Sequence, residues 1–255
     1  MILTVIENMP SVPLDRFAGW LTETPERAEP AVTLSLVRAW AGDPIPSLAE
    51  CGDGLLVLGG QGHALDDAGC PWLPATRALL AEAATSGLPT LGICLGAQLL
   101  AVATGGRVQV AAPPGREAGV IDLHPRPEAA ADALLGGLAA DVPADHPLNG
   151  GVLAAMPSMH ADAVVDLPSG AVWLASSRLY PYQAFRVGSA WGLQFHPEVG
   201  EATFTAWAEL HDDVDTDDVV AQLRSRADEV DHAGREIAQR FAALVRQRAA
   251  LALTR

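Results

Sequence analysis

The sequence predicts an α/β protein with a doubly wound, mainly parallel sheet and helices on both faces. Two observations lead to this fold class. Short apolar runs, as expected for strands covered on both faces, alternate with segments of helical periodicity over residues 2–104. Glycine-rich turns follow several of these segments, as at Gly59-Gly60 and Gly105-Gly106. Such alternation is typical of parallel sheets, whose binding sites lie at the carboxyl ends of the strands.

The first half of the chain supplies the parallel part of the predicted sheet. Apolar runs predict four strands, at residues 2–6, 32–37, 55–58 and 90–93. Apolar residues at helical spacing predict helices at 14–21, 72–86 and 95–103, and a Pro- and Gly-rich loop is expected at 42–46. The strands 55–58 and 90–93 both end in glycine-rich turns, so we expect these turns at the carboxyl edge of the sheet.

The second half of the chain changes in pattern. Strands are expected at residues 108–110, 119–123, 171–175, 184–187 and 191–195, a short helical piece at 132–138, and a surface loop at 140–151. After Glu198 the chain becomes helical, around residues 204–210 and 237–251, and the acidic run 211–218 between them is expected to be a solvated loop or a helix start. We therefore predict one domain over residues 1–200 and a helical extension over 201–255 packed on the same domain.

The composition excludes several classes of function. The 255 residues carry a formal net charge of -15, which argues against nucleic acid, and the absence of lysine excludes Schiff-base chemistry and a P-loop. No apolar run reaches the length of a membrane span and no basic segment precedes the apolar start, so we expect neither a membrane segment nor a signal peptide. The 3 cysteines are widely spaced, which predicts a reduced, cytoplasmic protein without a structural metal or other cofactor.

The segment Gly92-Ile93-Cys94-Leu95-Gly96 is the strongest local signal for chemistry. It lies between an apolar strand and a helix, and its two glycines permit a tight turn that exposes a thiol at the end of the strand. The N-terminus of the following helix favours a thiolate there. The pattern also fits a buried cysteine in a strand-to-helix turn, so by itself it leaves a nucleophile and a structural cysteine open.

His196 is the best candidate for a proton carrier among the 7 histidines. It ends an apolar run in Gln194-Phe195-His196-Pro197-Glu198, where Glu198 can reach an imidazole nitrogen. A carboxylate there would hold the tautomer and stabilise the imidazolium, as the third member of a triad does. A simple surface hydrogen bond is the alternative. The residues expected in packing or at the surface are Cys51, Cys70, His63, His124, His146, His211 and His232.

Together these segments resemble the class I, triad-type glutamine amidotransferases, in particular stand-alone members similar to the glutaminase module of GMP synthase. The likeness covers residues 2–198 and rests on the Cys94 turn with Gln98, the Gly59-Gly60 loop, the segment Met159-His160-Ala161-Asp162 and the His196 segment. We therefore expect a flavodoxin-like doubly wound sheet with a C-terminal helical extension.

The resemblance implies a role for each matching residue. Cys94 would be the nucleophile, His196 the general base and acid, and Glu198 the orienting carboxylate. The backbone N–H groups of Gly60 and Leu95 would form the oxyanion hole. The residues expected to bind substrate are Gly59, Gln98, His160 and Gln183, with Asp162 beside His160 at the rim of the pocket.

The chain departs from the family pattern in three places. Gln61 follows Gly60 where fused synthase modules have Pro, and Leu95-Gly96-Ala97 stands where GMP synthase has Tyr-Gly-Met. Nothing after Glu198 resembles a synthetase domain. An ammonia acceptor would therefore be a separate synthetase or acceptor protein, or none is used.

Three hypotheses about function remain open. The first is hydrolysis of the side-chain amide of glutamine through a cysteinyl γ-glutamyl thioester, releasing ammonia and glutamate. The second is hydrolysis of γ-glutamyl peptides or conjugates by the same triad, which an open cleft beside Gln61, His63 and residues 180–183 would favour. The third is an inactive binding module, against which the complete set of Cys94, His196 and Glu198 argues.

Overall fold

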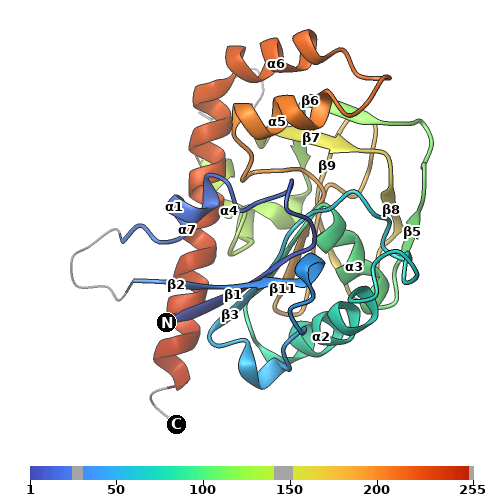
Figure 1. Ribbon diagram of the computed structural model, residues 1–255. Helices are drawn as coiled ribbons and strands as arrows, with labels where there is room; N and C mark the ends of the chain where they lie inside the picture. Colours follow the sequence, from blue (N-terminus) through green and yellow to red (C-terminus); the bar gives the residue numbers. More distant parts are fainter. Residues whose placement is uncertain (25–30, 141–151, 253–255) are drawn as a thin grey trace.

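A nine-stranded mixed sheet forms the centre of the molecule (Figure 1). The computed structural model describes residues 1–24, 31–140 and 152–252, and its sheet has the order β2-β1-β3-β4-β11-β10-β9-β6-β7. The five parallel neighbours are β2 (Thr33–Arg38), β1 (Ile2–Glu7), β3 (Gly54–Val57), β4 (Thr90–Ile93) and β11 (Ala190–Leu193). The antiparallel strands are β10 (Ala184–Val187), β9 (Val172–Ser176), β6 (Glu117–Pro125) and β7 (Ala154–His160). A separate two-stranded sheet pairs β5 (Arg107–Gln109) with β8 (Ala163–Asp166).

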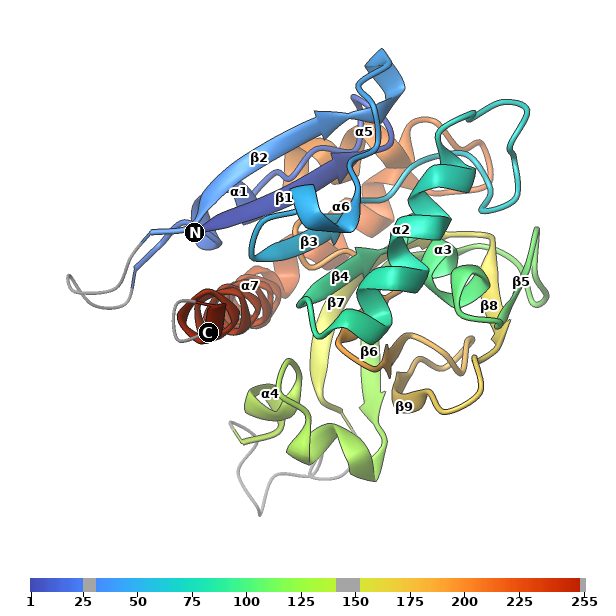
Figure 2. The same ribbon diagram turned by 90° about the horizontal axis from the view of Figure 1, so that it is seen from below.

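Helices cover both faces of this sheet (Figures 1 and 2). The longer helices are α2 (Leu73–Ser86), α3 (Leu95–Ala103), α5 (Glu201–Ala208), α6 (Thr216–Ser225) and α7 (Ala227–Ala252). Helices α2 and α3 pack on one face, and α7 packs on the other together with the short α1 (Phe17–Trp20). Helix α5 packs on α6, which lies against β6. The predicted doubly wound α/β fold, with helices on both faces and a helical C-terminus, is confirmed.

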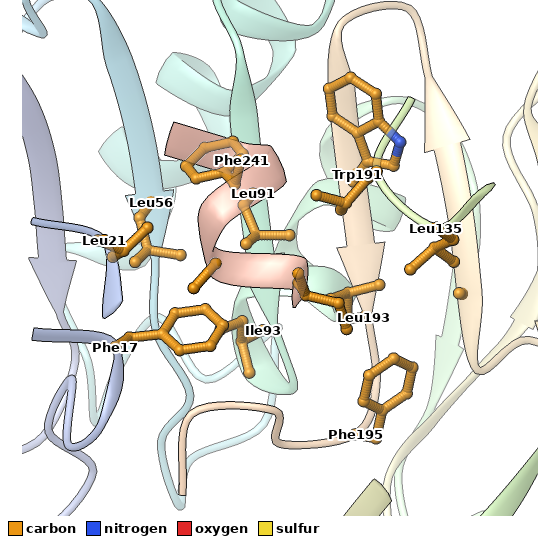
Figure 3. Close-up of a cluster of buried hydrophobic side chains, with 14 of the residues drawn as sticks. Phe17, Leu21, Leu56, Leu91, Ile93, Leu135, Trp191, Leu193, Phe195 and Phe241 are labelled. Atoms are coloured by element: carbon orange, nitrogen blue, oxygen red, sulfur yellow. The ribbon is translucent and has the colours of Figure 1, made fainter. Parts of the chain in front are cut away.

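The hydrophobic core under α7 ties the end of the chain to its beginning (Figure 3). Phe241 of α7 and Phe17 of α1 pack with Leu56, Leu91 and Ile93 of the parallel strands, and all five are fully buried. Burying a side chain of this size contributes about 1.5–3 kcal/mol relative to its exposed state. The apolar face of α7 therefore belongs to the main core. The division of the chain at residue 200 stays a prediction.

Two strands and one helix escaped the sequence prediction. All but the first residue of β7 are buried, so its side chains do not alternate between apolar and polar, and Pro157 is tolerated because β7 lies at the end of the sheet order. Strand β8 was also not predicted. Helix α6 begins inside the acidic run 211–218, which was expected to be a loop or a helix start, and Asp215 caps it by accepting from the N–H of Asp218; the body of α6 was not predicted.

The single helical piece predicted at residues 132–138 is wrong in detail. A 3-10 turn covers Pro127–Ala131 and α4 covers Gly136–Ala140. Between them the backbone is extended at Asp132, whose carboxylate accepts from the N–H groups of Leu134 and Leu135. The loop predicted at 140–151 lies outside the described residues from 141 onward. In the parts of the chain that the structure describes, none of the helices combines the length and apolar composition of a membrane crossing.

The parallel strands place the predicted site residues at one edge. β3, β4 and β11 are neighbours, and their carboxyl ends lead respectively into Gly59-Gly60, Cys94 and His196. Segments separated by about a hundred residues thus meet because the strands before them are parallel and adjacent.

Candidate active site

Cys94 occupies a sharp turn between β4 and α3. Its backbone has φ 50° and ψ -106°, a conformation that residues other than glycine rarely adopt. The flanking glycines allow the turn to pack closely. A Cβ at Gly92 would lie 2.5 Å from the carbonyl oxygen of Gly96, and a Cβ at Gly96 would collide with the carbonyl oxygen of Val57. The turn presents Cys94 at the N-terminus of α3, where the helix dipole favours negative charge.

His196 and Glu198 form a buried pair next to Cys94. Nδ1 of His196 lies 2.7 Å from Oε1 of Glu198, and the two side chains are 4% and 0% exposed. Burial is the largest influence on the imidazole and acts to lower its pKa. The charges of Glu198 and Cys94, with hydrogen bonds to both, outweigh burial and raise the pKa of His196 to about 10. An imidazolium at His196 is therefore the stable form at neutral pH.

Three neighbouring segments fix the position of this pair. The backbone N–H of His196 donates to the carbonyl oxygen of Pro157 on β7 at 2.8 Å. The carbonyl oxygen of Glu198 accepts from the N–H of Arg16 at 3.1 Å. The imidazole also contacts the ring of Trp207 on α5, with centroids 4.6 Å apart. The pair is thus held from a strand, from the N-terminal region and from the C-terminal helices.

The Gly59-Gly60 loop approaches both Cys94 and His196. The Asn8 side chain anchors the loop by donating to the carbonyl oxygen that precedes Gly59, at 2.7 Å. A Cβ at Gly60 would lie 2.9 Å from Cδ2 of Leu95, and a Cβ at Gly59 would lie 3.2 Å from Cε1 of His196. Leu95 is the first residue of α3, so its N–H has no acceptor within the helix. The two backbone segments predicted to form an oxyanion hole are therefore neighbours.

A cleft of about 490 Å³ opens over Cys94 and His196, and Gln98 and His160 line it. Nε2 of Gln98 donates to the carbonyl oxygen of Asp162 at 2.9 Å, and Asp162 also lines the cleft. Gln183, in contrast, is fully buried and is not part of the lining. The structure therefore brings two of the predicted substrate residues to the cleft, whereas Gly59 is buried outside the lining and Gln183 lies away from it.

A buried polar network centred on Glu117 lies behind the cleft wall. Glu117 accepts from Nε2 of Gln183 and from Oγ of Ser177, both at 2.6 Å, and its Oε2 lies 3.2 Å from Nε2 of His160. Glu117 on β6 is also paired with His160 on β7 in the sheet register. Gln183 thus supports the wall that holds His160. Glu117 was not predicted as a site residue, because it lies before the strand predicted at 119–123 and its partners are distant in sequence.

Several lining residues were not predicted as site residues, among them Arg116, Trp207, Leu210 and His211. Nε of Arg116 donates to the carboxylate of Asp213 at 3.0 Å and 3.1 Å, and Nη1 of Arg116 lies 3.5 Å from Nε2 of His211. Burial and the Arg116 charge lower the pKa of His211. The assignment of His211 to packing or surface is therefore corrected. These contacts join residues about a hundred positions apart, so no local sequence pattern predicts them.

The remaining cysteines do not line the cleft. Cys51 is buried, and burial raises the pKa of its thiol to about 11. Cys70 is partly buried and also free. His146 lies outside the described residues. Among residues 1–24, 31–140 and 152–252, no group of three or more His, Cys, Asp or Glu side chains could hold a metal ion.

Several curated proteins are similar to this chain, and most of them are much longer than the segment that matches. The glutamine-hydrolyzing GMP synthase of Thermomicrobium roseum is 40% identical over 116 residues, which cover 45% of this chain and 18% of the relative. A relative from Methanosarcina barkeri, named as one subunit of a glutamine-hydrolyzing GMP synthase, is 33% identical over 170 residues, 64% of this chain and 76% of the relative. The chain thus spans about a fifth of the length of the first curated relatives it matches.

One relative and one solved structure add to this picture. The gamma-glutamyl-L-1-hydroxyisopropylamide hydrolase of a Pseudomonas species is 31% identical over 168 residues, 63% of this chain and 53% of the relative. A glutamine amidotransferase from Thermotoga maritima superposes with a TM-score of 0.76 at 22% identity, covering 95% of this chain and 98% of that one, which shows the shared fold. The family model of glutamine amidotransferase class-I matches residues 32–207. Because that match covers well over half of the chain, the chain belongs to the class-I glutamine amidotransferase family.

Proposed function

We propose that the chain hydrolyses the side-chain amide of glutamine, or of a related γ-glutamyl compound, through a thioester on Cys94. The observation that carries the proposal is one cleft with Cys94 at a strained turn, the buried pair of His196 and Glu198 beside it, and the neighbouring backbone segments of Gly60 and Leu95. Nucleophile, base and orienting carboxylate in this arrangement are suited to acyl transfer.

The reaction divides into acylation and deacylation. The Cys94 thiolate attacks the amide carbon, and the N–H groups of Gly60 and Leu95 stabilise the oxyanion, where each donor contributes about 2.7–4 kcal/mol in other enzymes. The protonated His196 gives its proton to the leaving nitrogen as the C–N bond breaks. Water, deprotonated by His196, then hydrolyses the thioester and releases glutamate. Glu198 keeps the imidazole oriented and stabilises its charged form in both steps.

The amino-acid part of the substrate needs polar partners, which one wall of the cleft offers. The side chains of Gln98 and Asp162 line that wall and can bind the α-amino group. Among the described residues, Arg116 is the one arginine in the lining, and its Nη2 has no hydrogen-bond partner there. Its guanidinium would pair with the α-carboxylate.

The fate of the ammonia is a second part of the proposal. Several relatives are named glutamine-hydrolyzing GMP synthase, and one of them is named as a separate subunit of such an enzyme. A separate synthetase or acceptor protein is therefore one destination, and release into solution is the other. We place the reaction in the cytoplasm, because all three cysteines are free, as expected in a reducing compartment.

A second candidate function is hydrolysis of γ-glutamyl conjugates. The cleft of about 490 Å³ favours it, because the cleft reaches the exposed Leu210 and so offers room for a substituent on the amide nitrogen. The relative named gamma-glutamyl-L-1-hydroxyisopropylamide hydrolase supports the same conclusion.

Release of ammonia and glutamate from glutamine by the purified chain tests the proposal. We expect turnover that is lost in Cys94→Ala and kept in Cys70→Ala, a matched control because Cys70 is free and lies outside the cleft. An electrophilic glutamine analogue should label the wild type at Cys94. Neither turnover of any γ-glutamyl amide nor labelling at Cys94 would contradict the proposal.

A further inference from the structure

We propose that the segment after residue 200 makes the cleft selective for γ-glutamyl amides whose nitrogen carries an apolar group. This inference rests on the proposed hydrolysis at Cys94 and goes further, because it names the leaving group and assigns its binding to the C-terminal helices. Three features carry it: the side of the cleft from which His196 acts, the side chains on that side, and an exposed leucine beside them.

The position of His196 decides where the leaving group lies. The leaving nitrogen must receive a proton from His196, so it has to lie within hydrogen-bond reach of the imidazole. Any substituent on that nitrogen therefore extends over the residues that surround His196. The amino-acid part of the same substrate extends toward Gln98 and Asp162, which are polar and bonded to each other in the cleft wall.

Three apolar residues line the cleft together with His196 and form an apolar wall: Val12, Met159 and Trp207. All three line the cleft, and all three belong to one buried hydrophobic cluster. Trp207 contacts the imidazole, with centroids 4.6 Å apart, and its Nε1 donates to the carbonyl oxygen of Ser11 at 2.7 Å, which fixes the indole beside Val12. The indole N–H is thus already occupied, so this wall turns an apolar surface to the cleft.

Leu210 extends the wall toward solvent. It follows α5 (Figure 1), and its backbone N–H donates to the carbonyl oxygen of Trp207 at 3.1 Å, one turn back. Leu210 lines the cleft with its side chain 57% exposed, among the largest exposures of any large hydrophobic residue described. Glutamine, whose leaving group is ammonia, would leave this leucine and the wall in water. An alkyl or aryl group on the nitrogen would cover them, which is favourable in proportion to the apolar area removed from water.

The reaction on such a substrate balances without any further reactant than water. The Cys94 sulfur forms a bond to the δ-carbon, the C–N bond breaks, and the nitrogen takes the His196 proton and leaves as a primary amine. Water supplies the hydroxyl that displaces sulfur from the thioester and returns the proton to His196. The products are glutamate and the amine.

The test compares kcat/KM for glutamine and for γ-glutamyl-isobutylamide, measured as glutamate release. Burial of a few carbons of the isobutyl group predicts a preference of about ten- to a hundredfold over glutamine in the wild type. Leu210→Ser should lower the ratio of the two values about five- to tenfold, and Leu210→Ile should restore most of it. Leu36→Ser is the matched control, because Leu36 is 40% exposed on the edge strand β2, outside the cleft, and should leave both values unchanged.

A binding measurement separates recognition from chemistry. Cys94→Ala cannot form the thioester, so calorimetry on this variant should give a lower Kd for γ-glutamyl-isobutylamide than for glutamine, and the difference should shrink when Leu210→Ser is added. Turnover of glutamine at least as good as that of the isobutylamide, with Leu210→Ser affecting both alike, would overturn the inference and leave the proposed function standing. Absence of turnover on every γ-glutamyl amide, with no labelling of Cys94, would overturn both.

Discussion

Replacing Glu198 by glutamine tests whether this carboxylate keeps His196 protonated. Glutamine has nearly the same shape, and its carbonyl oxygen can still accept from Nδ1 of His196. The second carboxylate oxygen, Oε2 of Glu198, has no hydrogen-bond partner among the described residues, so an amide NH₂ group in its place would displace no donor. The substitution therefore removes a charge and little else.

The expected size of the effect follows from the geometry. With Oε1 and Nδ1 2.7 Å apart, the two charges are centred about 4 Å from one another, which gives about 4 kcal/mol at an effective dielectric constant of about 20. That corresponds to about three pKa units. Glu198 is the largest of the influences that raise the pKa of His196 to about 10, ahead of Cys94, so removal of the carboxylate should lower that pKa by about three units.

The pH dependence of kcat/KM for amide hydrolysis follows this shift directly. His196 must carry a proton to give to the leaving nitrogen, so activity should fall on the alkaline side as pH passes the pKa of His196, near 10 in the wild type. In Glu198→Gln the alkaline limb should move to about pH 7, with a loss of about a hundredfold at pH 9 from protonation alone.

The exposed Glu229 on α7 provides the matched control, because Glu229→Gln makes the same chemical change far from the cleft and should leave the profile unchanged. The rate at which iodoacetamide alkylates Cys94 also depends on the charge of His196 and Glu198, and it can be measured without turnover. Its pH profile should change in Glu198→Gln and stay unchanged in Glu229→Gln. An alkaline limb that stays within about half a unit of the wild-type position would refute the reasoning.

Three further substitutions test other parts of the site. Arg116→Gln should lower kcat/KM at least about tenfold for glutamine and for glutaramate but not for 4-aminobutanamide, which lacks the α-carboxylate; equal losses on all three would remove Arg116 from carboxylate binding. Gly96→Ala should lower the free energy of unfolding in urea by about 3 kcal/mol, because its Cβ meets the backbone of β3, whereas Gly19→Ala, with open space around it, should be nearly neutral. Glu117→Ala leaves buried donors without an acceptor and should cost about 1–3 kcal/mol per donor, so an unchanged urea midpoint would contradict the role of the network.

The parallel half of the fold could be predicted because each strand is a short apolar run ended by glycine or a turn. Strand 90–93 and the helix after Cys94 were placed with the bounds that the structure gives them. The close approach of Gly92 to Gly96 lies within five residues, which is why a local pattern identified the turn, although Gly96 also packs against Val57 of β3. The same holds for His196 and Glu198, whose hydrogen bond spans two residues in sequence.

The elements and site residues that were not predicted depend on contacts between segments distant in sequence. β7 is buried on both sides, so neither alternation nor a strong apolar run marks it, and its Pro157 resembles a break. Glu117 and Gln183 are 66 positions apart, and Arg116 and Asp213 are 97 apart, so their pairing follows from strand order rather than from spacing. Gln183 was assigned to the cleft on family likeness, which gives a position in the chain but not the direction of a side chain.

The chain after residue 200 serves two parts of the molecule at once. Helix α7 fills the core on one face of the sheet with Phe241, while α5 and the turn after it set Trp207 against His196 and Leu210 in the cleft. A truncation at residue 200 would therefore expose the core and open the site together, and loss of activity in it would say nothing about specificity. Substitution of the half-exposed Leu210 avoids this difficulty, because its side chain contributes to the cleft and little to the core. Substitution of Leu210 therefore tests the proposed role of the helical extension in substrate choice without removing its contribution to the core.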